Sequence, residues 1–145
     1  MRFVTTVDIR RSPEEVFKYL AHFENVPMWN YAIAETAKVS AGPVGVGTRY
    51  RQVRSIPRRS EEGFEVTAFE PHRKLAIEGT LGPFASVLEY RIDPTEGGSR
   101  VTNEVQLTPR GVLGVVGQLA PSRVKEAVAK NLGELKRLLD AAAHD

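Results

Sequence analysis

Residues 7–29 read "VDIRRSPEEVFKYLAHFENVPMW", and the hydrophobic pattern changes its period within this stretch. Before Ser12 the chain mixes β-branched and polar residues with a period of two, which is typical of a strand. From Ser12 the pattern is helical, because Ser12 suits the N-cap, Pro13 the first helical position, and Glu15 completes a capping box. A second, short helical turn follows, with Trp29 as its largest apolar residue. The stretch predicts a strand followed by two short helices.

The chain beyond this stretch is rich in strand-like runs as far as Leu107. Short turn signals, such as "PTEGG", separate one run from the next. Together with the N-terminal strand, the expected strands are residues 2–11, 34–41, 46–56, 61–70, 73–81, 84–93 and 99–107. Because most connections are short, we expect neighbouring strands to pair as antiparallel hairpins.

The last third of the chain has helical periodicity. The apolar residues that recur on one helix face are Val124, Val128, Leu132, Leu135 and Leu139. Only this helix is long enough to cover the apolar face of the sheet. Pro121 is expected to kink the helix or divide it, because proline lacks the amide hydrogen. The sequence predicts an α+β fold in one domain, residues 1–145, with seven antiparallel strands, two short helices after the first strand, and a long C-terminal helix.

Composition narrows the chemistry that this chain can perform. Apolar residues make up 41% of the 145 residues and charged residues 26%, as in ordinary globular domains. There is no cysteine, which excludes disulfides, thiolate metal sites and a cysteine nucleophile. The three histidines are far apart, and "GPVGVG" matches neither a dinucleotide loop nor a P-loop. We expect no metal and no cofactor.

Net charge and hydropathy indicate whether the chain binds nucleic acid, inserts into a membrane or is exported. The net charge is only +2, and glutamates follow closely on the arginines of residues 49–59, so nucleic-acid binding is not expected. The N-terminus lacks the apolar core of a signal peptide, and no apolar run is long enough to span a bilayer. We expect a soluble, cytoplasmic protein without stable membrane insertion, either a monomer or a homodimer.

The arginines of the strand at residues 46–56 fall on two faces, because alternate side chains of a strand point in opposite directions. One face carries Gly47, Arg49, Arg51, Val53 and Ser55, and we expect it to face water. The other face carries Val46, Thr48, Tyr50, Gln52, Arg54 and Ile56. Two interpretations of Arg54 stay open: it joins Tyr50 and Gln52 in a polar ladder inside the fold, or it reaches solvent from near the strand end.

The inward faces of the later strands are mostly apolar with a few polar tips. Candidate ligand-binding residues on these faces are Phe64, Val66, Ser86, Leu88, Tyr90 and Asn103. Apolar walls with a few hydrogen-bonding groups are typical of a ligand cavity, but an ordinary core has the same pattern. Gly111, Gly114 and Gly117 recur every three residues before the terminal helix. They favour empty space beside a helix, with Gly114 and Gly117 as candidate binding positions, or an apolar loop at a cavity entrance.

Several segments in this order resemble a known family. They are residues 7–29, "VGVGTRY", "FEVTAFEPHRKLAIEG", "LEYRIDPTEGGSRVTNEVQL" and the long terminal helix. Together they resemble the START-like, Bet v 1-like helix-grip domains of the SRPBCC superfamily, in particular the bacterial polyketide cyclase/dehydrase branch. The resemblance covers nearly the whole chain. It implies a curved sheet wrapped on the C-terminal helix, with a deep cavity between them for a hydrophobic or aromatic small molecule.

The resemblance also implies roles for individual residues. Aromatase/cyclase members of the branch shape a polyketide with pocket aromatics and polar groups, including an arginine on an inner strand. Tyr50 and Arg54 would then be the tentative catalytic residues, with Arg54 stabilising oxyanion charge and Tyr50 or Tyr90 exchanging protons. Trp29 is similar to the family's helical tryptophan and joins the candidate binding residues.

Three functions remain open at this point. The first is a non-catalytic binding or carrier protein, and the second is a polyketide aromatase, cyclase or dehydratase. The third is a co-chaperone-like protein-interaction domain with a small, filled cavity, because one fold can host unrelated functions.

Overall fold

The computed structural model describes residues 1–81, 84–110 and 121–142. Its strands are β1 (Arg2–Ile9), β2 (Ile33–Lys38), β3 (Arg49–Arg54), β4 (Ser60–Glu70), β5 (Lys74–Leu81), β6 (Phe84–Thr95) and β7 (Gly98–Pro109). Its helices are α1 (Pro13–Ala21), the 3-10 helix η1 (Phe23–Asn25), α2 (Val26–Trp29) and α3 (Pro121–Ala142). The predicted order of elements is confirmed.

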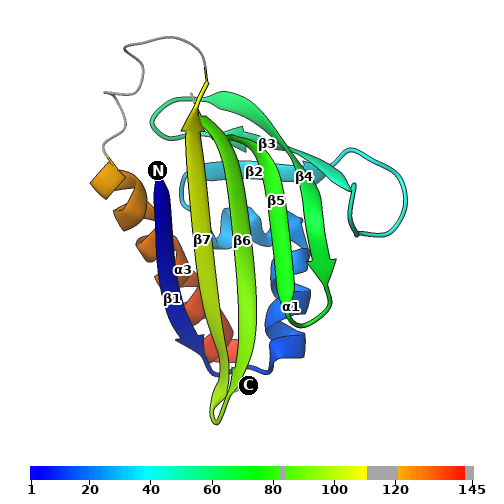
Figure 1. The fold of residues 1–145 in the computed structure, drawn as a ribbon, viewed down its shortest axis with the longest axis vertical. Helices are drawn as coiled ribbons and strands as arrows, with labels where there is room; N and C mark the ends of the chain where they lie inside the picture. Colours follow the sequence, from blue (N-terminus) through cyan, green and yellow to red (C-terminus); the bar gives the residue numbers. More distant parts are fainter. Residues whose placement is uncertain (82–83, 111–120, 143–145) are drawn as a thin grey trace.

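The strands form one antiparallel sheet in the order β1-β7-β6-β5-β4-β3-β2. Strands β2 to β7 pair as the expected meander, and β1 closes the far edge by pairing with β7. Figure 1 shows the helices on one side of the sheet, with α3 behind β1 and β7 and with β2 and β3 turned strongly across the direction of β6. The sheet therefore curves, and its concave face points toward the helices.

Side chains from α1 and α3 meet the concave face in the larger of two apolar clusters. Leu132, Leu135 and Leu139 of α3 are buried in the same cluster as Ile9 of β1 and Val101 of β7. This is the helix face that the sequence periodicity predicted. None of the helices in the described ranges is both long and apolar enough to cross a membrane.

The helix boundaries follow the expected capping chemistry. The amide of Glu15 donates to Ser12 Oγ at 3.2 Å, and the Ser12 hydroxyl donates to Glu15 Oε1 at 3.0 Å. The helix α3 begins at Pro121, where proline is tolerated because amides of a first turn have no helical partner. The expected kink is therefore not inside the described helix, and the glycine series of residues 111–117 lies outside the described residues.

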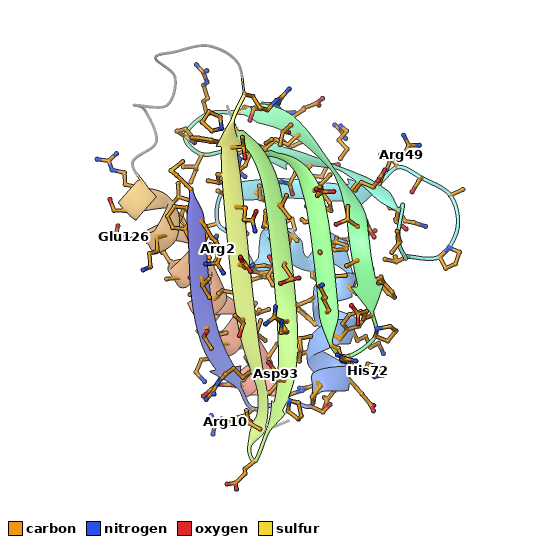
Figure 2. The ribbon with its side chains drawn as sticks, in the orientation of Figure 1. Arg2, Arg10, Arg49, His72, Asp93 and Glu126 are labelled. Carbon is orange, nitrogen blue, oxygen red and sulfur yellow. The ribbon has the colours of Figure 1, made fainter. Side chains whose placement is uncertain are left out.

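The two faces of β3 largely follow the expected division. Arg49 and Arg51 are exposed, and Figure 2 shows Arg49 at the margin of the molecule. Arg51 Nη2 lies 3.0 Å from Glu61 Oε1 on this outer side. The prediction is wrong for Val53, which is only 2% exposed. Val53 pairs with β2 beside the register shift between Ile33 and Glu35, and strict alternation is least reliable beside such a bulge.

Gly98, at the start of β7, gives a direct test of how tightly the hairpin between β6 and β7 packs on β1. Its φ is +152°, and a Cβ there would lie 2.2 Å from Ile9 O and 2.8 Å from Arg11 N. Because both contacts are backbone atoms, we expect Gly98→Ala to lower the free energy of unfolding by about 1–3 kcal/mol in urea denaturation. A Cβ on the neighbouring Gly97 would meet open space, so Gly97→Ala is the control, with a change within about 0.5 kcal/mol. Equal effects of the two substitutions would contradict this account.

Candidate functional site

A row of polar side chains crosses the concave face on β2, β3 and β4. Thr36 lies opposite Gln52, and Gln52 lies opposite Glu62. The Glu62 carboxylate accepts a hydrogen bond from Gln52 Nε2 at 3.0 Å through Oε1 and one from Arg54 Nε at 2.8 Å through Oε2. The side chain of Glu62 is 3% exposed and that of Arg54 14%. Arg54 therefore lies in a polar ladder with Gln52 instead of extending into solvent.

An aromatic group adjoins this ladder. The Tyr50 ring stacks on Phe64 with a centroid separation of 5.0 Å, and Phe23 of η1 packs on both rings at 4.8 and 5.3 Å. Burial, and secondarily the negative charge of Glu24, raises the pKa of Tyr50 to about 12. The phenol is therefore a neutral hydrogen-bond donor at physiological pH. Its oxygen is buried and has no hydrogen-bond partner among the described residues.

A second aromatic pair lies in the same core. The rings of Trp29 and Tyr90 meet edge to face with a centroid separation of 6.3 Å. Burial raises the pKa of Tyr90, so this phenol also stays neutral. Trp29 Nε1, which can only donate, is buried and lacks a partner within the described part of the chain. Trp29 and Tyr50 thus each present an unsatisfied donor to the interior.

Two threonine hydroxyls add to this set. Thr5 of β1 lies opposite Asn103, which in turn lies opposite Tyr90, so Thr5 belongs to the concave face. Its Oγ1 and that of Thr36 are buried without a partner in the described ranges. Asn103, in contrast, uses Nδ2 to donate to the Glu89 carbonyl at 3.4 Å.

An apolar row lies between the polar groups. Its members, paired across the sheet, are Phe3, Val105, Leu88, Ile77 and Val66. Val66 and Val105 are fully buried, yet Ile77 and Leu88, in the middle of the row, are only half-buried. Val128 of α3 is also half-buried and packs against both of the apolar clusters that flank this position. The concave face is therefore not fully covered at Ile77 and Leu88.

The remaining sequence candidates divide into two groups. Phe64, Val66, Ser86 and Asn103 are buried on the concave face, as the alternation predicted. Gly114 and Gly117 lie outside the described residues. In the described ranges, no three acidic or histidine side chains gather in a way that could hold a metal ion.

Two surface hollows lie away from these residues. One, of about 570 Å³, is formed by the turn into α1, the hairpin between β6 and β7, and the end of α3. The other, of about 230 Å³, lies between the turn after β4 and the neighbouring part of β6. Neither is lined by Trp29, Tyr50 or Arg54. The candidate site is the interior surface and not either of these hollows.

Sequence reasoning missed Glu62, Thr5 and Thr36 as members of this surface. A usable signal for Glu62 was present, because it stands two residues before Phe64 and therefore shares its strand face. In the sequence, Glu62 counts only as a charge that balances the neighbouring arginines. Its hydrogen-bond donors, Gln52 and Arg54, could be identified only from the register between β3 and β4.

Comparisons with known proteins agree with this architecture. The family model described as "Polyketide cyclase / dehydrase and lipid transport" matches residues 1–140. Uncharacterized protein Rv2574 of Mycobacterium tuberculosis is 31% identical over 107 residues, which are 69% of this chain and 61% of that protein. The match thus spans about three fifths of the relative.

Solved structures share the fold at lower identity. TTHA0849 from Thermus thermophilus has a TM-score of 0.77 and 18% identity, over 98% of this chain and 99% of that one. The di-domain ARO/CYC protein StfQ from the steffimycin biosynthetic pathway has a TM-score of 0.79 and 14% identity, over 99% of this chain and 52% of that one. With the fold and the family match in agreement, the chain belongs to the polyketide cyclase/dehydrase and lipid transport family of the SRPBCC class.

Proposed function

We propose that this protein binds a hydrophobic or aromatic small molecule between the concave face of the sheet and α3. The observation that carries the proposal is the pair of buried donors, Tyr50 OH and Trp29 Nε1, that lack partners in the described part of the chain. A buried polar group without a partner costs about 1–3 kcal/mol. Acceptor atoms of a bound ligand would supply the missing partners.

The surroundings of these donors suit such a ligand. Apolar walls with a few well-placed polar groups are the usual lining of a small-molecule site. Phe23, Phe64 and Tyr90 provide aromatic surface, and the half-buried Ile77 and Leu88 provide apolar surface that is not fully covered. The family, whose description includes lipid transport, supports an apolar guest, and its match to residues 1–140 supports a single domain.

Binding without catalysis is the function that this geometry supports best. The neutral phenols of Tyr50 and Tyr90 are suited to donate hydrogen bonds but not to accept a proton at neutral pH. The charge of Arg54 is compensated by Glu62, which weakens its use as an oxyanion stabiliser. A cyclase or aromatase is the second candidate, favoured by the position of Tyr50 and Arg54 on one face of β3 and by the fold shared with StfQ.

The single tryptophan of the chain gives a direct assay, because Trp29 lies in the proposed site. We expect saturable changes in Trp29 emission when the protein is titrated with a panel of flavonoids, aromatic polyketides, sterols and fatty acids. Tyr50→Phe should weaken the tightest ligand about three- to tenfold, the effect of one lost hydrogen bond. Tyr31→Phe, at an exposed tyrosine, is the matched control and should leave affinity unchanged. If no compound changes emission or melting temperature, the proposal fails.

The same substitution has an opposite expected effect on the ligand-free protein. Removing the Tyr50 hydroxyl also removes an unsatisfied buried group, so Tyr50→Phe should leave the free energy of unfolding unchanged or raise it by up to about 1 kcal/mol. Urea denaturation of the two phenylalanine variants measures this, with Tyr31→Phe expected near zero. A clear loss of stability in Tyr50→Phe would show that the hydroxyl already has a partner in the free protein.

A further inference from the structure

Glu62 is an unusual residue for an apolar interior. Glutamate is almost never fully buried unless it is paired, and this side chain is 3% exposed. Its position opposite Gln52 and two residues from Phe64 places it on the concave face, beside the aromatic group of Tyr50. The carboxylate is therefore part of the surface that a ligand would meet.

The contacts of Glu62 determine what charge Arg54 presents. Each carboxylate oxygen has its own donor: Gln52 Nε2 reaches Oε1 and Arg54 Nε reaches Oε2. Arg54 is planar and always charged, and by itself it would attract a carboxylate or enolate from a ligand. With Glu62 bound to its Nε, the pair has no net charge.

An anionic ligand would therefore be desolvated on binding without forming an ion pair with an uncompensated Arg54 in return. It would also approach the carboxylate of Glu62, whose repulsion offsets the attraction of Arg54. A neutral ligand meets no such penalty. The unsatisfied donors of the same core, Tyr50 OH and Trp29 Nε1, are complementary to acceptors such as ketone or quinone oxygens.

We propose that Glu62 is a specificity-determining residue, which neutralises Arg54 and makes the interior select uncharged, carbonyl-bearing aromatic ligands over carboxylates. The inference rests on the proposed binding function. It differs from the role that the sequence suggested for Arg54, because it assigns the selectivity to the carboxylate beside it.

The test compares two ligands of nearly equal size, 2-acetylnaphthalene and 2-naphthoate, by isothermal titration calorimetry at pH 7.5. The ketone is neutral, whereas the acid, with a pKa of about 4, is ionised. We expect the wild-type protein to prefer the ketone by at least about tenfold in Kd. Glu62→Gln keeps the shape and an acceptor oxygen for Arg54, and it should reduce or reverse this preference by about tenfold or more, chiefly by tightening naphthoate.

Two further variants separate charge from structural damage. Glu61→Gln removes the neighbouring glutamate, which pairs with Arg51 on the outer side, and should keep the wild-type preference. The double variant Arg54→Gln/Glu62→Gln removes both charges of this ion pair and should prefer the ketone again. A melting curve of each variant confirms that it folds, and the double variant remains informative if Glu62→Gln does not fold.

The outcomes distinguish this inference from the function on which it rests. If the wild type binds both compounds equally, or if Glu62→Gln binds with the wild-type preference, the role of Glu62 is overturned while ligand binding stands. A double variant that prefers naphthoate would also overturn it. If neither compound binds the wild type at millimolar concentration, the aromatic ligand class of the proposed function fails, and the selectivity fails with it.

Discussion

The concave face of the sheet exposes more apolar surface than the strands can bury by themselves, and covering that face is the constraint that shapes the rest of the molecule. Leu132, Leu135 and Leu139 of α3 lie on it, together with Phe17 and Leu20 of α1. This burial is the main favourable term in folding. The helices do not bury the whole concave face, since Ile77 and Leu88 stay half-buried, and this leaves apolar surface for a guest beside the aromatic and polar groups.

Features that depend on local sequence could be predicted from the chain alone. The cap at Ser12, the apolar stripe of α3 and the faces of Tyr50 and Tyr90 follow from short-range periodicity and capping chemistry. Arg54 was ambiguous, because a strand end read from sequence is uncertain by several residues. The contact of Arg54 with Glu62 fixes its side chain on the concave face, and this contact depends on how β4 is aligned with β3.

Interactions set by register or by neighbouring strands could not be predicted. The pairing of β1 with β7 joins the first and last described strands in chain order and brings Thr5 opposite Asn103, although the two residues are nearly a hundred positions apart. Val53 illustrates the same limit, because its burial accompanies a register shift in β2. Periodicity states which residues share a face, whereas the partners of a polar residue on that face depend on the alignment of several strands.

The buried polar atoms of this protein are unevenly distributed, and that distribution is the strongest reason to regard the interior as a site. Folding alone favours phenylalanine over tyrosine and valine over threonine where no partner exists, because an unsatisfied polar atom costs free energy. In the described ranges, Thr5, Trp29, Thr36 and Tyr50 nevertheless keep such atoms inside the fold. The carboxylate of Glu62, in contrast, has donors on both oxygens. A concave face that pairs the charges of Arg54 and Glu62 yet leaves neutral donors unsatisfied is complementary to an uncharged guest with acceptor atoms.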